Sequence, residues 1–192
     1  MKAKTISIEA DGLKIKGTAE LAASVFVQAL PPAANIQPVV ASSVPEIGLP
    51  WPGQGGINGG YIEARGDVPA HYLIFGAKDL GEFAWGRYRE ESKATSKWDG
   101  KANTDALIAA GGHPAAEAAR AYTADGHNDF DLPAARQLYQ AWAHDLISDG
   151  CYWSSSQRSA YLAFFMDFVD GSQLRYDKIL ELRVRPVRRL FI

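Results

Sequence analysis

The first 30 residues carry a period-two pattern of apolar and polar positions. Ile6 and Ile8 alternate with polar neighbours, Asp11-Gly12 follows, and two further alternating apolar residues come after it. An Asp-Gly pair readily takes the positive φ angles of a tight hairpin turn. The pattern therefore predicts a β-hairpin within residues 1–30. Because a lone hairpin is marginal in water, it needs a partner surface, either this chain's own sheet or another molecule.

A proline-rich stretch follows the predicted hairpin. Residues 31–46 contain four prolines and few charges, a composition that is typical of an extended, semi-rigid connector. After it, residues 47–56 form a loop crowded with glycine and proline, and Tyr72–Phe75 read as a short buried strand. We therefore expect an N-terminal arm (1–30), a linker (31–46) and a folded domain (47–192).

The middle of the chain has helical spacing. Asn103-Thr104-Asp105 predicts a cap before a helix over 106–110, and Gly111-Gly112 predicts its end. A second helix is predicted from His113-Pro114 to Tyr122, because proline suits the first helical position. A third is predicted from Leu132-Pro133 through Trp142, where apolar residues recur every three or four positions.

The pattern returns to period two after Tyr152. Apolar residues alternate toward Phe168, Asp170-Gly171 signals a turn, and Val184 and Val187 flank a proline. We therefore expect antiparallel strands over residues 152–190. Together with the helices they predict an α+β fold, in which two or three short helices pack on a small, twisted antiparallel sheet.

Composition and charge indicate a globular protein without a dedicated polyanion partner. The 192 residues are 47% hydrophobic and 22% charged, and 20 Lys and Arg against 22 Asp and Glu give a formal charge of −2. Such a balance does not favour nucleic acid or an anionic membrane. Cys151 is the single cysteine, so no intrachain disulfide is expected. The N-terminal sequence lacks a signal-peptide pattern, so we expect synthesis in a cytoplasm, without membrane insertion.

Catalytic and metal-binding patterns are weak in this sequence. The four histidines do not form the helical pair of a zinc protease, and the oxygen-rich segment Asp125–Asp131 departs from the EF-hand pattern. Cys151 lies among apolar residues and fits an inert packing role. We expect the arginines of 183–189 to pair with carboxylates such as Asp129 and Asp131. The sequence therefore predicts no enzyme, no cofactor and no resident metal.

Five short motifs, taken in order, carry a resemblance to a known family. They are Trp98-Asp99-Gly100-Lys101-Ala102-Asn103-Thr104, Asp129-Phe130-Asp131-Leu132-Pro133, Tyr152-Trp153-Ser154-Ser155-Ser156, Phe168-Val169-Asp170-Gly171 and Val184-Arg185-Pro186-Val187-Arg188. The series resembles the Lcl-type C-terminal domain of bacteria and bacteriophages over residues 47–192. That family has a C-type-lectin-like fold similar to that of formylglycine-generating enzymes. The glycine- and proline-rich residues 48–56 further resemble its phage and prophage branch.

The resemblance implies a bacteriophage virion protein. Residues 1–30 would dock on other virion proteins, and a lectin-like head would bind a host-surface glycan or protein, as in a tail fibre. The alternatives are a capsid decoration or head-fibre protein, or a cellular enzyme or adhesin of the same fold. Because phage appendages usually have rotational symmetry, we expect a homotrimer in the virion.

In the lectin-like fold, loops that lead into the final strands form the exposed recognition region. Tyrosine and arginine are enriched at binding hot spots because each offers contact area and a directional polar group. The alternative is an ordinary surface or a subunit contact. The ligand-binding residues predicted on this basis are Gln157, Arg158, Tyr161, Gln173, Arg175, Tyr176 and Lys178.

Overall fold

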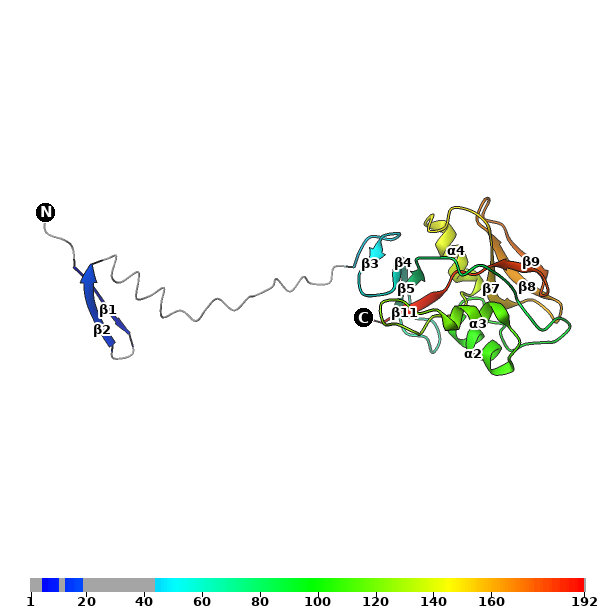
Figure 1. Cartoon of the computed structure of the whole chain (residues 1–192), viewed down its shortest axis with the longest axis horizontal. Helices are drawn as coiled ribbons and strands as arrows, with labels where there is room; N and C mark the ends of the chain where they lie inside the picture. The colour runs from blue at the N-terminus through cyan, green and yellow to red at the C-terminus, as the bar shows by residue number, and fades with distance from the viewer. Residues whose placement is uncertain (1–4, 11–12, 19–43, 192) are drawn as a thin grey trace. The chain divides into compact units, whose positions relative to one another are not determined.

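The computed structural model describes residues 5–10, 13–18 and 44–191, in two compact units, Met1–Ser43 and Val44–Ile192 (Figure 1). The first unit has the predicted hairpin. Strand β1 (Thr5–Ala10) pairs antiparallel with β2 (Leu13–Thr18), with Ile8 opposite Ile15. The predicted Asp11-Gly12 turn and most of the proline-rich linker lie outside the described residues.

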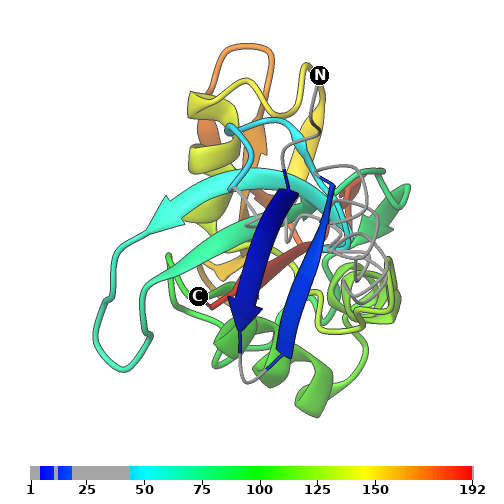
Figure 2. The same cartoon turned by 90° about the vertical axis from the view of Figure 1, so that its left-hand side faces the viewer.

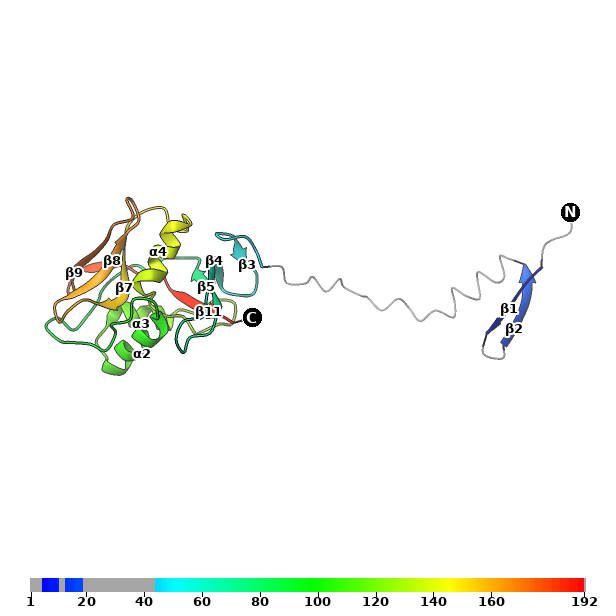
Figure 3. The ribbon, with the colours of Figure 1, turned by 180° about the vertical axis from the view of Figure 1, so that it is seen from behind.

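The second unit combines two sheets with three short helices over residues 44–191 (Figure 3). A five-stranded sheet has the order β6-β10-β7-β8-β9, and a four-stranded sheet has the order β11-β5-β4-β3. The strands are β3 (Pro50–Trp51), β4 (Gly56–Ile62), β5 (His71–Gly76), β6 (Glu82–Ala84), β7 (Cys151–Gln157), β8 (Leu162–Asp167), β9 (Gln173–Asp177), β10 (Glu181–Arg183) and β11 (Val187–Leu190). The helices are α2 (Gly100–Ala110), α3 (Pro114–Ala121) and α4 (Ala135–Ala143).

β7, the central strand of the five-stranded sheet, is buried on both faces, and its neighbouring residues point to opposite sides. Trp153 belongs to a core cluster that includes residues of α2 and α3. Tyr152 belongs to a second cluster, with residues of α4 and of the other sheet. The expected α+β class is therefore confirmed, whereas the expectation of a single small sheet is wrong. An apolar strand such as β7 needs cover on both faces, and the second sheet supplies part of it.

The sequence predicted that the final strands are all antiparallel, and this prediction is wrong for β10. β10 pairs antiparallel with β6 but parallel with β7, where Arg183 lies opposite Tyr152. The chain then passes Pro186 and enters β11, which pairs antiparallel with β5 in the other sheet. Proline has no backbone N–H to donate to a ladder, and its carbonyl oxygen instead accepts a bond of 2.8 Å from the Gly76 N–H. The chain therefore changes sheets at this proline.

The helices follow the predicted ends better than the predicted starts. α2 stops at Gly111 (φ 69°) and α3 begins at Pro114, as expected. The predicted cap at residues 103–105 is wrong, because the side chain of Asp99 caps α2 and accepts a hydrogen bond of 2.8 Å from the Ala102 N–H. α4 begins at Ala135, later than expected, since the chain just before it is engaged with α2. The Leu132 N–H donates to Thr104 Oγ1 at 3.0 Å.

Candidate binding groove

A groove of about 670 Å³ lies where three segments of the second unit meet. The first is the hairpin of β4 and β5, whose connecting loop projects from the unit in Figure 2. The second is the loop that leads into α2, and the third is the N-terminal part of α4 with the start of β9. The residues that line this groove are Tyr61, Ile62, Glu63, Ala64, Arg65, Val68, His71, Trp98, Arg136, Gln137, Tyr139, Gln140 and Gln173.

Glycines and a tight turn shape the β4–β5 side of the groove. The β4–β5 register shifts between Asn58 and Tyr61, and a side chain at Gly60 (φ 93°) would come within 2.8 Å of Gln140 Nε2. A glycine here therefore lets β4 approach α4 closely. At the far end of the hairpin, the backbones of Arg65 and Val68 bond to each other at 2.9 and 3.1 Å. This turn holds Arg65 at the rim of the groove.

Three aromatic side chains expose about half of their surface around the groove. Trp98 is 44% exposed, Tyr61 is 48% exposed and Tyr139 is 52% exposed. Each is held by a neighbouring group. The Arg65 guanidinium lies 4.0 Å from the centre of the Trp98 ring, while Tyr61 packs edge-on against Tyr72, with 5.2 Å between ring centres. Large, half-exposed rings that are fixed in place are suited to contact with a ligand.

The groove is lined by charged and amide side chains as well as by aromatic rings. The lining contains two arginines, Arg65 and Arg136, and one acidic residue, Glu63, and neither arginine forms a salt bridge within residues 44–191. Amide side chains add further donors and acceptors. Gln173 Nε2 donates to the Ala135 carbonyl at 2.6 Å, which fixes that side chain beside α4. The groove therefore offers apolar ring faces beside fixed polar groups.

His71 lies buried at the edge of the groove and contributes no charge at neutral pH. Its Nδ1 is 2.8 Å from the Pro69 carbonyl oxygen, and its ring packs against that of Phe191. Burial lowers the pKa of His71 below its ordinary value, and the nearby positive charge of Arg189 lowers it further, against the opposing effect of the bond to Pro69. The neutral ring acts as a hydrogen-bonding group rather than as a cation.

Asp99 anchors the loop that carries Trp98. Its carboxylate caps α2 and also pairs with the Arg189 guanidinium of β11. We expect Asp99→Ala to lower the unfolding free energy by about 1–2 kcal/mol, because a helix cap and a partly buried ion pair are lost together. Denaturant unfolding measures this change.

Asp99→Asn is the matched control for that substitution, since asparagine retains a capping oxygen without the charge. It should recover the part of the loss that belongs to the cap. Equal losses in the two variants would show that capping by Asp99 contributes little to stability.

Of the seven residues predicted to bind a ligand, Gln173 lines the groove. Arg158, Tyr161, Arg175 and Tyr176 are exposed elsewhere, around the β7–β8 turn and along β9. The predicted residues of β9 also lie on different faces of the sheet, because successive side chains of a strand point to opposite sides. Arg175 lies opposite Phe164 and Tyr176 lies opposite Ala163, on the two faces of the sheet. The seven residues therefore do not form one surface.

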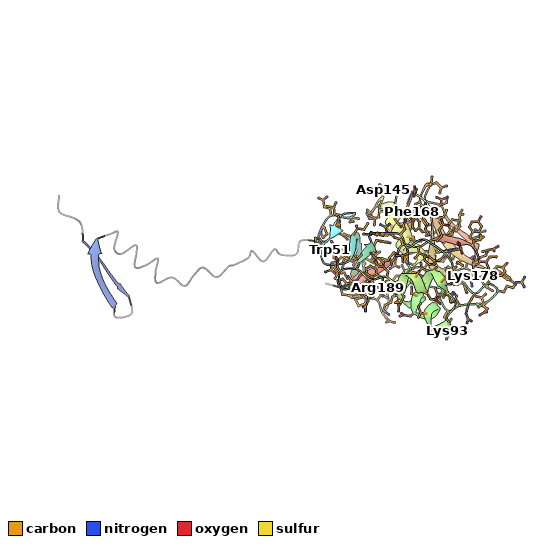
Figure 4. The ribbon with its side chains drawn as sticks, in the orientation of Figure 1. Trp51, Lys93, Asp145, Phe168, Lys178 and Arg189 are labelled. Atoms are coloured by element: carbon orange, nitrogen blue, oxygen red, sulfur yellow. The ribbon has the colours of Figure 1, made fainter. Side chains whose placement is uncertain are left out.

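The expectation that Gln157 and Lys178 are exposed is wrong. Lys178 is fully buried, and its Nζ donates to the Glu90 carbonyl at 2.8 Å and to Gln157 Oε1 at 2.7 Å. The ammonium also lies 4.6 Å from the centre of the Trp85 ring. Figure 4 shows Lys178 and Trp51 toward opposite ends of the second unit. The contacts of Lys178 with Glu90 and Trp85 hold loop 85–91 against the β9–β10 turn.

Sequence reasoning missed the aromatic side chains of the groove. Trp98 belongs to the first of the five motifs, Tyr139 lies in the predicted third helix, and Tyr61 occurs in a segment without a recognisable pattern. The groove depends on three segments that are far apart in the chain. The available signal was the presence of large aromatic residues beside polar loops, which indicates a site only once the fold brings them together.

Two further features of the described residues concern the Cys151 thiol and the distribution of possible metal ligands. Burial, and then the neighbouring Asp167, raise the pKa of the Cys151 thiol, which disfavours the reactive thiolate. Within the described part of the chain, no cluster of three or more His, Cys, Asp or Glu side chains could hold a metal ion. No helix there is both long and apolar enough to cross a membrane.

The C-terminal arginines form ion pairs, partly with the expected partners. Arg188 pairs with Asp129 at 2.7 Å, as predicted. Asp131 pairs instead with Arg120 of α3, at 2.6 Å. Arg183 and Arg185 pair with aspartates at 149 and 79 respectively. These arginines therefore join the strands to the surrounding loops.

Comparison with known proteins adds no relative. The chain matches no protein-family model, and no curated protein is significantly similar to it. The resemblance to the Lcl-type family therefore stays a prediction that rests on the five motifs.

Proposed function

We propose that the second unit is a non-enzymatic recognition head that binds a saccharide in the groove. The observation that carries this proposal is the set of three half-exposed rings, Trp98, Tyr61 and Tyr139, around one concave surface. A sugar ring has an apolar face of C–H groups that can lie on an aromatic ring, and its hydroxyls bond to amide and guanidinium groups. Both kinds of group occur in the groove.

The size of the groove suits a short saccharide. Pockets for small ligands are commonly about 300–1,000 Å³, and this one is about 670 Å³. Arg65 and Arg136 can donate to hydroxyl or acidic groups of the ligand, and Gln140 and Gln173 add amides. Because several of these side chains are already fixed by neighbours, less conformational entropy is lost on binding.

We further propose that this head is C-type-lectin-like and belongs to a bacteriophage virion protein. The five motifs support this assignment, and so does the hairpin of residues 5–18, which belongs to a separate unit. In this proposal residues 1–30 attach to other virion proteins, the chain forms a homotrimer, and the head binds a host-surface glycan. The chain would then act as a tail fibre or receptor-binding adhesin.

Substitution of Trp98 tests the groove. We expect Trp98→Ala to weaken saccharide binding about 10- to 100-fold, because the largest apolar contact and the support of Arg65 are both lost. A glycan array probed with the purified full chain identifies the saccharide, and calorimetry measures its affinity. Tyr139→Ala should weaken binding in the same assay by a smaller factor.

The double variant Tyr161→Ala/Tyr176→Ala is the control, since both side chains are about half exposed but lie outside the groove. It should bind saccharide normally. If this variant loses binding and Trp98→Ala does not, the recognition surface is the one predicted from the sequence. If the intact chain binds no saccharide on the array, the proposed function is wrong.

A further inference from the structure

β9 is an edge strand with an open side. It is the last strand of the five-stranded sheet and pairs only with β8 among the described strands. Residues 173–176 are all exposed. Leu174, Tyr176 and Ile179 form an apolar surface beside this edge, each with about half of its area exposed. An exposed edge with apolar side chains is a template for another strand.

The pairing with β8 determines which backbone groups of β9 are free. Asp167 N–H donates to the Ser172 carbonyl, and Lys178 N–H donates to the Tyr161 carbonyl. Because bonded pairs alternate in an antiparallel ladder, Leu174 and Tyr176 turn their backbone groups toward β8. Arg175 and Asp177 therefore turn theirs outward, where a further strand could bond to them, although the Asp177 carbonyl already accepts a hydrogen bond of 3.0 Å from the Leu180 N–H.

The sequence of β9 is complementary to itself in one antiparallel register. We propose that β9 pairs with β9 of a second copy of this chain about a two-fold axis at Tyr176. Each Arg175 then lies opposite Asp177 of the other copy. The Asp177 N–H donates to the Arg175 carbonyl, and the Asp177 carbonyl, which has two lone pairs, accepts the Arg175 N–H in addition to that of Leu180. The two Tyr176 side chains lie directly opposite each other, in the closer, non-hydrogen-bonded kind of pair.

The charges select this register over the next one. A shift of the axis to Arg175 would keep the outward backbone groups matched, but it would place two arginines opposite each other, which is destabilising. In the proposed register both charged pairs are opposite in sign. Arg175 and Asp177 form no salt bridge within residues 44–191, so each is available to the other copy. Charged residues on an edge strand usually prevent pairing with another strand. Arg175 and Asp177 instead favour pairing with β9 of a second copy.

Because a two-fold contact cannot be satisfied within a three-fold assembly, this contact joins heads of two different trimers, and it is independent of the groove and of residues 1–30. It gives Tyr176 and Arg175 a role as subunit contacts. The apolar surface around Leu174 and Ile179 becomes covered in the pair. The occupant is a second copy of the chain because the complementarity is isologous, so one surface supplies both halves of the interface.

Cysteine cross-linking tests the register in the full chain. In the proposed pair the two Tyr176 Cα atoms are about 4.5 Å apart, within the range that a disulfide can bridge. Tyr176→Cys should therefore form a disulfide-linked dimer under mild oxidation. Leu174→Cys is the matched control, because it is equally exposed and lies on the same face. Its two copies would be about 13 Å apart, four residues along the strand.

Cross-linking of Leu174→Cys as efficient as that of Tyr176→Cys would overturn the proposal, and so would an absence of dimer in the Tyr176→Cys chain. The unsubstituted chain, with Cys151 alone, gives the background in the same gel.

Charge reversal provides a second test that needs no oxidation. Arg175→Asp and Asp177→Arg each place like charges opposite each other, so either variant alone should lose the head-to-head contact. Mixing the two variants restores both opposite-charge pairs, as does the double variant. Sedimentation velocity measures the loss and the recovery. Association that is unchanged in the single variants, or that mixing does not restore, would contradict the pairing.

Discussion

Trp153→Ala is expected to lower the unfolding free energy of the second unit by about 3–5 kcal/mol. Trp153 is fully buried between the five-stranded sheet and the helices α2 and α3, and it packs edge-on against Phe165. Its indole N–H donates to the Phe83 carbonyl at 2.9 Å, so truncation removes a hydrogen bond as well as a large apolar volume. The loss is a large part of the 5–15 kcal/mol that stabilises a typical domain.

Trp98→Ala is the matched control for this prediction. It removes the same side chain from a half-exposed position at the groove, and it should change stability by much less while it weakens ligand binding. Trp153→Phe keeps an aromatic ring in the core and should retain enough stability for measurement if the alanine variant does not fold. A change below 1 kcal/mol in the Phe variant and the Ala variant alike would contradict this account of the core.

Lys178 should make stability rise with pH in the alkaline range. Burial lowers the pKa of Lys178 to about 8 from 10.5, against the opposing effect of Glu91 and Glu90. Between these two values the unfolded chain binds more protons than the folded chain, so the free energy of unfolding increases with pH. Below about pH 8 both states carry the charge and the cost of its burial is constant. The expected rise is about 1–3 kcal/mol.

Lys178→Met isolates this contribution, because methionine fills a similar volume without a charge. The difference in unfolding free energy between the two proteins should change between pH 8 and 10.5 and stay constant below pH 8. The two hydrogen bonds of Nζ do not oppose this trend, since a neutral amine still has two protons to donate. A pH-independent difference would show that Lys178 keeps an ordinary pKa in the folded chain.

Features that depend on neighbouring residues could be predicted from the sequence. The stop at Gly111 and the start at Pro114 follow from backbone preferences that hold in any context. The hairpin β1–β2 follows from local alternation, and β5 (His71–Gly76) follows from the apolar run Tyr72–Phe75. The cap of α2 was misplaced because Asp99 and Asn103 are both capping residue types. Asn103 instead bonds to Ser96 and Ser155, and the second of these lies 52 residues away.

Features that depend on distant partners could not be predicted. Lysine is normally a surface residue, and the burial of Lys178 requires Glu90 and Gln157, which come from other parts of the chain. The second sheet requires β11 to leave β10 at Pro186 and cross to β5. The groove likewise requires the fold, since the rings of Tyr61, Trp98 and Tyr139 are far apart in sequence.

The last two strands place a constraint on folding during synthesis. β10 joins β6 to β7 and β11 covers the edge of β5, so both sheets remain incomplete until residues 181–190 have been made. At about 5–20 residues per second, the ribosome needs roughly 7–30 s to extend the chain from residue 44 to residue 181. Until those residues arrive, β5 lacks its β11 neighbour and β7, once it has been made, lacks its β10 neighbour, so each strand leaves one apolar edge unpaired. Because unpaired strand edges are prone to aggregate, we expect the nascent head to need shielding until the C-terminal segment arrives.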